Sequence, residues 1–132
     1  MSDEQKVLNA VLNMTKAFHN QDIDGVMAAY APGAVVCFEP GKPVGDRGEI
    51  EQSFRGFFTI NPNFTYAGHQ VVVAGDTAVH IAPWQMEGTG PDGGAVNMRG
   101  LSVAVLQRQA DGRWLLVVDN PYGNQAEASD QN

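Results

Sequence analysis

Apolar positions in the first half of the chain repeat every three or four residues, which is the period of an amphipathic helix. The first such segment follows a capping box, in which Ser2 and Gln5 can each satisfy a free backbone N–H group of the other. The apolar face of this segment consists of Val7, Val11, Met14 and Phe18. The pattern predicts a helix that is interrupted at the polar run 19–21.

Two shorter helices are predicted further along the chain. Asp22 can cap the second helix, and Pro32-Gly33 ends it. The apolar residues of the second helix are Ile23, Val26, Met27 and Tyr30. Asp46, with Glu49 three residues later, caps the third helix, and Asn61-Pro62 stops it. The apolar stripe of the third helix is Ile50, Phe54, Phe57 and Phe58.

Residues 34–39 form a short apolar run that predicts a strand, and the second half of the chain reads as sheet. Four runs rich in Val, aromatic residues and alternation predict strands at about 64–74, 77–87, 95–109 and 113–120. Short turns and one glycine-rich loop join these runs, so we expect an antiparallel meander. Helices first and strands after predict an α+β fold, with the helices covering one face of a curved sheet.

Composition and charge narrow the class of protein. The chain has 132 residues, of which 43% are hydrophobic, and this suits one domain with its own core. We expect that domain to span 1–123 and the polar segment 124–132 to be a disordered tail. With 8 basic against 15 acidic residues, the formal charge is −7. Neither nucleic acid nor an anionic membrane is therefore an expected partner.

Cysteine content and hydropathy indicate the compartment. Cys37 is the single cysteine, so the chain forms no internal disulfide and no thiolate metal cluster. The N-terminal MSDEQK is polar, and no apolar run approaches the roughly 20 residues that span a bilayer. We expect a soluble, cytoplasmic protein.

Three stretches carry a family resemblance. They are AFHNQDIDGVMAAYAPGAVV (17–36), VGDRGEIEQSF (44–54) and VLQRQADGRWLLVVDNPYG (105–123). With the order of elements, they resemble the nuclear transport factor 2-like superfamily, which includes the SnoaL-like and ketosteroid isomerase-like proteins. The resemblance implies a cystatin-like α+β roll: a cone of bent antiparallel sheet around three helices, with an apolar pocket at one end, usually a homodimer through the sheet. That fold hosts isomerases, cyclases, dehydratases, hydrolases and non-catalytic modules.

The ketosteroid isomerase pattern implies a role for one acid. Glu39, followed by Pro40, falls on the segment that holds the catalytic aspartate of that enzyme, so the resemblance implies that Glu39 is the proton-shuttling base. Met14 stands where the tyrosine of the first helix would be, and Ala104 where the second acid would be. Loss of such oxyanion partners removes several kcal/mol of transition-state stabilisation. Steroid isomerase activity by the usual mechanism is therefore not expected.

The residues themselves leave two interpretations of Glu39. Glu39 shares the two-residue period of Val35 and Cys37. It either meets solvent at the end of the strand or points into a pocket, where burial would raise its pKa and suit it to acid–base work.

A second carboxylate, Asp119, also ends an apolar strand. By the alternation of WLLVV it lies on the face of Leu115 and Val117. It either bonds the backbone of the loop at 120–122 or faces the same pocket as Glu39. Two carboxylates in one cavity would have separated pKa values and could divide the roles of acid and base.

His69, His80 and Trp84 are candidates in the predicted sheet. The two histidines can pair across the hairpin at Gly75-Asp76, although a packed structural role is commoner for such residues, and neither is spaced for a metal ion. Trp84 follows Pro83, which lacks a ladder donor, so that strand is bent, bulged or at an edge. Trp84 can cap a ligand, belong to a dimer interface or lie in the core.

The remaining ligand-binding candidates come from the helices and from one strand. Helix residues near the opening of a cone form both core and pocket wall. These candidates are Met14, Phe18, Tyr30, Phe54 and Phe58. Ser102 joins them from the strand face that it shares with Ala104. Arg99, on the opposite face, either holds an anionic ligand group or forms an ion pair.

One motif is excluded. GTGPDG (88–93) has the spaced glycines of a dinucleotide site, but it leads into a strand and not into a helix. We expect no nucleotide, no other cofactor and no metal.

Two functional hypotheses follow. The first is a cofactor-independent isomerase, cyclase or dehydratase for a small apolar molecule, with Glu39 as shuttle and Asp119 or a histidine assisting. The second is a ligand-binding or dimerisation module of the same shape. A second polar group within reach of a reacting atom near Glu39 indicates the enzyme. A solvated Glu39 and a wholly apolar cavity indicate the binder.

Overall fold

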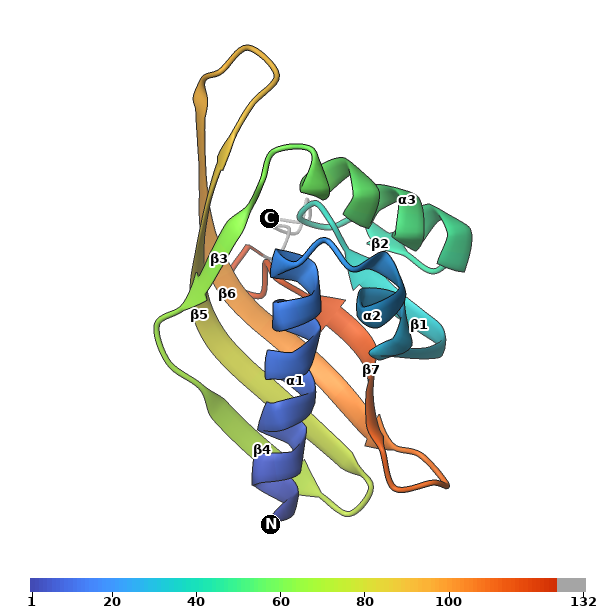
Figure 1. Ribbon diagram of the computed structural model, residues 1–132. Helices are drawn as coiled ribbons and strands as arrows, with labels where there is room; N and C mark the ends of the chain where they lie inside the picture. Colours follow the sequence, from blue (N-terminus) through green and yellow to red (C-terminus); the bar gives the residue numbers. More distant parts are fainter. Residues whose placement is uncertain (126–132) are drawn as a thin grey trace, which may run out of the picture.

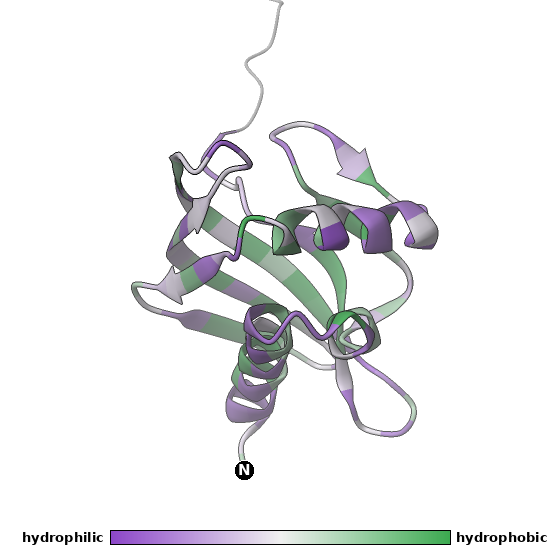
Figure 2. Cartoon of the chain, turned by 45° about the horizontal axis from the view of Figure 1, so that its top comes forward, coloured by the Kyte–Doolittle hydropathy of each residue, from purple (hydrophilic) through white to green (hydrophobic). Residues whose placement is uncertain are grey.

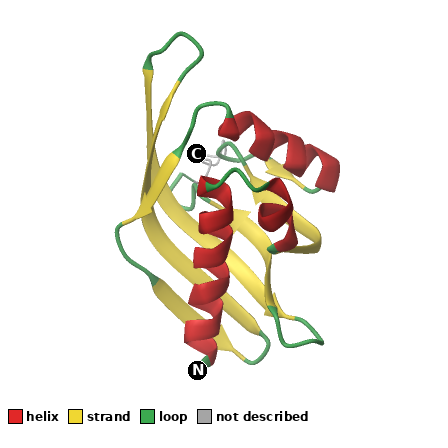
Figure 3. Ribbon diagram, in the orientation of Figure 1, coloured by secondary structure: helices red, strands yellow, loops and turns green. Residues whose placement is uncertain are grey.

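The computed structural model describes residues 1–125 as an α+β fold, with three helices on one side of a curved, seven-stranded sheet (Figures 1 and 3). The elements are α1 Asp3–His19, α2 Ile23–Ala28, β1 Tyr30–Cys37, β2 Pro43–Val44, α3 Arg47–Phe58, β3 Asn63–Tyr66, β4 Gln70–Ala74, β5 Thr77–Thr89, β6 Ala95–Arg108 and β7 Trp114–Asn120. The predicted fold class is confirmed. The disorder predicted from residue 124 onward falls mostly on 126–132, outside the described residues.

The antiparallel meander predicted for the second half of the chain is confirmed in β3 to β7, but the sheet as a whole is mixed, and this corrects the wholly antiparallel sheet that the resemblance implied. Its strand order is β2-β1-β7-β6-β5-β3, with β4 also paired to β5, and the path does not close. β1 runs parallel to β7, with Val36 opposite Asp119. The two strands are joined through most of the chain and not by a hairpin, so nothing forces them to be antiparallel. This pairing brings the end of β7 beside β1 and so creates the site described below.

The run predicted as one strand at 64–74 is two strands, β3 and β4. Both pair with β5, but β3 stops opposite Trp84 and β4 begins opposite Ile81. The break lies opposite Pro83, which has no N–H to donate to a ladder. The carbonyl of Pro83 still accepts a 2.9 Å hydrogen bond from the backbone N–H of Ala67. The predicted irregularity next to Trp84 is therefore present.

The three predicted helix caps are confirmed. Ser2 accepts from the N–H of Gln5 at 3.1 Å, Asp22 from Gly25 at 3.1 Å, and Asp46 from Glu49 at 2.9 Å. Each bond satisfies a donor that the first helical turn would otherwise leave free.

Tyr30 lies on a strand and not on the second helix, contrary to the prediction. α2 ends at Ala28, and Tyr30 begins β1 opposite Leu116. Arg47 helps to fix this boundary, because its Nη2 donates to the carbonyl of Met27 at 2.7 Å and so satisfies a carbonyl at the helix end. The early end of α2 turns the Tyr30 side chain to the interior, where it is 2% exposed.

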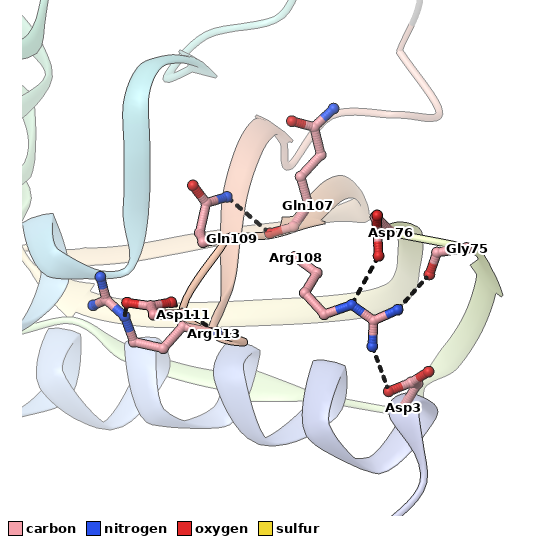
Figure 4. A network of polar contacts seen from close by, with 8 residues as sticks. All are labelled: Asp3, Gly75, Asp76, Gln107, Arg108, Gln109, Asp111 and Arg113. Atoms are coloured by element: carbon pink, nitrogen blue, oxygen red, sulfur yellow. Dashed lines mark hydrogen bonds and ion pairs between the residues drawn. The ribbon is translucent and has the colours of Figure 1, made fainter.

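Arg108 of β6 fastens the start of α1 to the sheet (Figure 4). Its guanidinium donates to Asp3 at 3.1 Å, to Asp76 at 2.9 Å and to the carbonyl of Gly75 at 3.2 Å. It also lies 5.1 Å from the ring centroid of Trp114. Figure 4 places this network beside the first turn of α1 and the β4–β5 turn, and none of its residues lines the cavity described below.

The core lies between α1, α3 and the sheet. Hydrophobic segments are concentrated in the strands, while α1 and α3 carry hydrophilic residues along much of their length (Figure 2). Fully buried members include Val7, Val26, Ile50 and Leu106. Burying one such side chain contributes about 1.5–3 kcal/mol. Among the described residues, no helix has the length and apolarity that crossing a bilayer requires.

Candidate functional site

A half-open cavity of about 90 Å³ lies between α1, α3 and the sheet. Its wall is chiefly aromatic and sulfur-containing. The aromatic members are Phe18, Phe38, Phe54, Phe57, Phe64, Tyr66, Trp84 and Tyr122, and the methionines are Met14, Met86 and Met98. A wall of this kind binds apolar molecules, and methionine lets it adapt to their shape.

Asp119 is the charged residue in that wall. The hydroxyl of Tyr30 donates a hydrogen bond to its Oδ2, and Oδ1 has no hydrogen-bond partner among the described residues. Burial raises the pKa of the Asp119 carboxyl, and the hydrogen bond from Tyr30 opposes part of that rise. A carboxyl with a raised pKa in an apolar cavity is suited to exchange protons with a bound molecule.

Tyr30 remains a phenol and therefore a donor. Burial, and then the charge of Asp119, raise the pKa of Tyr30 well above its ordinary value. Because Tyr30 is buried in the core, its ring cannot move away from the carboxyl, and the Asp119 side chain is held in one orientation.

A β-bulge in β7 turns Asp119 to the cavity. Leu116 and Val118 pair with successive residues of β6, so Val117 is an extra residue that reverses the alternation. Leu116 is therefore buried, Val118 is 40% exposed, and Asp119 faces inward. The prediction that Asp119 shares the face of Leu115 and Val117 is wrong, because it assumed an unbroken period of two.

A hydroxyl pair, Tyr66 of β3 and Thr15 of α1, forms another part of the wall. Their oxygens are 3.1 Å apart, and Thr15 also donates to the carbonyl of Val11 at 3.0 Å. Burial is the main cause that raises the pKa of Tyr66 to about 12. Tyr66 was not among the sequence candidates, although the alternation of Phe64 and Tyr66 in NFTY was a signal that both face inward.

The segment after β7 completes the wall. Trp84 donates from Nε1 to the carbonyl of Pro121 at 2.8 Å, and the hydroxyl of Tyr122 donates to the carbonyl of Phe38 at 3.1 Å. The ring of Trp84 also stacks on Phe64, with centroids 4.9 Å apart. Trp84 thus belongs to both the core and the cavity wall.

Glu39 does not point into the cavity, so of the two interpretations of this residue the inward orientation is wrong. β1 ends at Cys37, so the strand period does not extend to Glu39. The Glu39 side chain is 62% exposed and forms an ion pair with Lys42 at 2.9 Å. A carboxylate in that position is solvated and lies outside the wall of the cavity.

His69 and His80 pair across the hairpin, which is one of the arrangements considered from the sequence. Nδ1 of His69 and Nε2 of His80 are 2.9 Å apart. His80 is 1% exposed, and burial lowers its pKa to about 4. Both rings pack against Tyr66, with centroids at 4.8 and 5.8 Å, so the pair lies behind the wall and not in it.

The other sequence candidates divide between wall, core and surface. Met14, Phe18, Phe54, Trp84 and Ser102 line the cavity. Tyr30 acts on it through Asp119, whereas Phe58 packs against Phe18 and does not line it. Arg99 is exposed and lies away from the cavity. Among residues 1–125, no cluster of three or more His, Cys, Asp or Glu side chains is placed to hold a metal ion.

The fold and the cavity define a class: an open α+β roll around an apolar pocket with a single carboxyl. The family model of the SnoaL-like domain matches residues 11–117, and the chain belongs to that family. The family assignment agrees with the resemblance found in the sequence. No curated protein matches the chain.

Several solved structures share the fold. One is a ketosteroid isomerase-like protein from Erwinia carotovora atroseptica, 18% identical, covering 90% of this chain and 94% of its own, with a TM-score of 0.76. Another, from Novosphingobium aromaticivorans, carries the provisional name aromatic ring hydroxylase. It is 23% identical, the match covers 89% of this chain and 86% of that one, and the TM-score is 0.79. A third is the association domain of C. elegans CaMKII. It is 17% identical, the match covers 88% of this chain and 92% of that one, and the TM-score is 0.70. At these identities the likeness establishes the fold alone.

Proposed function

We propose that the protein is a cofactor-independent acid–base catalyst for a small, largely apolar molecule, with Asp119 as the group that moves the proton. The observation that supports this is the placement of Asp119 in the wall of an otherwise apolar cavity, oriented by the buried hydroxyl of Tyr30. The reaction class is isomerisation, cyclisation or dehydration, in which a proton leaves one atom of the substrate and returns to another.

In an isomerisation, the Asp119 carboxylate removes a proton from the carbon beside a carbonyl group. The electron pair of the broken C–H bond moves into the conjugated enolate, and the Asp119 carboxylic acid then returns the proton further along the same system. Tyr30 holds one carboxyl oxygen, so the other exchanges the proton. The raised pKa of Asp119 makes the carboxyl a stronger base than a solvated aspartate.

In this hypothesis Asp119 has the proton-shuttling role that was predicted for Glu39. The solvated Glu39 by itself matches the arrangement expected of a binder. The cavity is not wholly apolar, however, because Asp119 lies in its wall, and this favours the enzyme.

The conversion of cyclohex-3-enone to cyclohex-2-enone tests the proposal, because the conjugated product absorbs in the ultraviolet. We expect turnover by the native chain and a loss of at least a hundredfold in Asp119→Asn, the range of a missing general acid–base. Glu39→Gln is the matched control, since it removes an exposed carboxylate, and it should retain native turnover. Equal rates in all three proteins would contradict the proposal.

The second candidate is a non-catalytic binding module. The hydrogen-bonding groups of Tyr66, Tyr122 and Trp84 are already bonded within the protein, so few polar groups of the wall remain for a substrate. This observation favours the module. Ligand binding that is unchanged in Asp119→Asn, without turnover of any enone or ketone by the native chain, would support the module over the enzyme.

Self-association through the outer face of the sheet is part of the proposal. On β6 the side chains of Ser102, Ala104 and Leu106 are buried, so the alternate residues Val103 and Val105 face outward, and both are apolar and only partly buried. Sedimentation of the native chain should give a dimer, and Val103→Lys should shift it to monomer. A native monomer at high concentration would contradict this part.

A further inference from the structure

The size of the cavity limits what it can hold. One ordered water needs roughly 10–15 Å³ of such space, so about 90 Å³ admits on the order of six to nine atoms of water size. A ligand with one ring fits this space. A fused tetracyclic skeleton is larger than this space, so most of it would remain outside the opening of the half-open cavity.

The wall also limits the charge of the ligand. Among the lining residues, Asp119 is the ionisable acid, and no Lys, Arg or His is present to pair with a bound anion. Burying an unpaired charge costs far more than one hydrogen bond returns. An anionic ligand is therefore not expected.

Ser102 is a polar group of this wall that lacks a partner. Its side chain is 7% exposed and lines the cavity, and its hydroxyl forms no hydrogen bond with any described residue. The other hydroxyls of the wall differ: Thr15 and Tyr66 bond each other, and Tyr122 bonds the carbonyl of Phe38. The oxygen of Ser102 is not one of the fully buried unpaired atoms, so it is open to the cavity, where a bound acceptor can pair with its hydroxyl.

Ser102 and Asp119 lie on the same face of adjacent strands. Ala104 of β6 is paired with Asp119, and Ser102 is two residues along β6 from Ala104. The two are therefore diagonal neighbours, with Cα atoms about 7–8 Å apart and side chains that both border the cavity. One small ligand can contact both.

We propose that the cavity selects a ligand of one-ring size that is not an anion, whose single oxygen acceptor receives a hydrogen bond from the hydroxyl of Ser102. This proposal rests on the proposed function of the site and adds a specificity-determining residue and a size limit to it. Ser102 holds the ligand oxygen, and Asp119 then faces the neighbouring carbon. Met14 and Ala104, which stand at the two oxyanion positions of the isomerase pattern, cannot donate a hydrogen bond to the ligand oxygen. The hydroxyl of Ser102 can.

Binding is measured by NMR of the methionine methyl groups, titrated with cyclohexanone and with methylenecyclohexane, in which a CH₂ replaces the oxygen. Cyclohexanone should shift the signals of Met14, Met86 and Met98, which line the cavity, and not that of Met27, which is buried elsewhere. Ser102→Ala should weaken cyclohexanone binding about three- to tenfold, the value of one neutral hydrogen bond. Binding of methylenecyclohexane should not change, which also shows that the variant cavity is intact.

Ser53→Ala, on α3 and outside the wall, is the matched control and should bind both probes as the native chain does. Ser102→Cys keeps the size of the side chain with a weaker donor and should give an intermediate loss. The tetracyclic ketone progesterone should leave the three methionine signals unchanged.

Three results would overturn the inference: equal cyclohexanone affinity in Ser102→Ala and Ser53→Ala, progesterone binding as tightly as cyclohexanone, or no response of the cavity methionines to either small probe. The proposed function fails separately. Binding that depends on Ser102, without enone turnover that depends on Asp119, would refute the catalyst and leave the ligand class standing. Turnover that depends on Asp119 but not on Ser102 would support the catalyst and refute the role of Ser102 in ligand binding.

Discussion

The hydroxyl of Tyr30 donates a hydrogen bond to Oδ2 of Asp119, and this contact joins the first residue of β1 to the penultimate residue of β7. The parallel pairing of these strands brings the two residues together although 89 positions separate them in the chain. The bond lowers the pKa of Asp119, and burial, which is the larger effect, raises it. The pKa of the cavity carboxyl is thus set by two opposing effects, and each can be altered alone.

Tyr30→Phe removes the hydrogen bond and keeps the ring. The pKa of Asp119 should rise further, because the effect that lowers it is lost. The free energy of unfolding should fall by about 1–3 kcal/mol, the cost of leaving a buried acceptor unpaired. A carboxyl ¹³C NMR titration measures the pKa, and urea denaturation measures the stability.

The matched control for that variant is Tyr122→Phe. Tyr122 also borders the cavity, but its hydroxyl donates to the carbonyl of Phe38 and not to Asp119. The Tyr122→Phe variant should therefore have the same Asp119 pKa as the native chain. An equal rise in both variants would mean that Tyr30 acts through general packing.

Asp119→Asn should stabilise the protein at neutral pH by about 0.5–2 kcal/mol while abolishing proton transfer. The sign follows from the raised pKa. The folded state binds this proton more tightly than the unfolded state, so the favourable contribution is full below the unfolded pKa and is lost as pH rises through the folded one. The variant should therefore gain stability over the native chain as pH rises above 3.8, the ordinary pKa of an aspartate, toward neutrality. Thermal unfolding across that range checks it, and a parallel pair of curves would contradict it.

Local signals were sufficient to predict much of the fold. The three helix caps act within three residues of sequence, so Ser2, Asp22 and Asp46 could be assigned from the sequence alone. The turn at Gly75 could be assigned for the same reason, since glycine adopts its positive φ of 61° without strain. The parallel pairing of β1 with β7 could not, because no local pattern reports which distant strand is a neighbour.

The site depended on two features that periodicity hides. The bulge at Val117 reverses the alternation of β7, and an unbroken period placed Asp119 on the wrong face. The end of β1 at Cys37 leaves Glu39 in a turn, where the backbone N–H of Lys42 donates to its carbonyl at 3.2 Å. Residue type alone identified Glu39 and Asp119 as candidates for acid–base chemistry. Their orientations were set by one extra residue in one strand and by the early end of another.

His80 should make the protein sensitive to acid. Its pKa is lowered to about 4 from an ordinary value of 6.5, first by burial and then by the neighbouring His69. The folded state prefers the neutral ring, so this contribution is present above pH 6.5 and is lost as pH falls through about 4. The loss is on the order of 3 kcal/mol.

His80→Gln removes the titrating ring, so its stability should vary less between pH 6.5 and 4 than that of the native chain. Urea denaturation at several pH values measures the difference. The effect is opposite in sign to that of Asp119, so the double variant with Asp119→Asn separates the two contributions. A native stability that does not change over this interval, with the Asp119 contribution removed, would show that His80 is not the acid-sensitive group.

Gly100→Ala should distort the cavity wall, because a Cβ there would lie 2.6 Å from the carbonyl of Pro121 and 3.0 Å from the ring of Trp84. Since Pro121 accepts the hydrogen bond from Trp84, the new methyl group must displace one member of that pair. We expect the free energy of unfolding to fall by about 1–3 kcal/mol, as for other overpacked sites, together with a shift in Trp84 fluorescence and weaker binding of cyclohexanone.

Gly56→Ala is the control for this variant. Nothing lies within 4 Å of a Cβ at that position of α3, and alanine should stabilise the helix by about 0.5–1 kcal/mol. If Gly100→Ala were as stable as the native chain and bound cyclohexanone equally well, the segment after β7 would not be a fixed part of the wall.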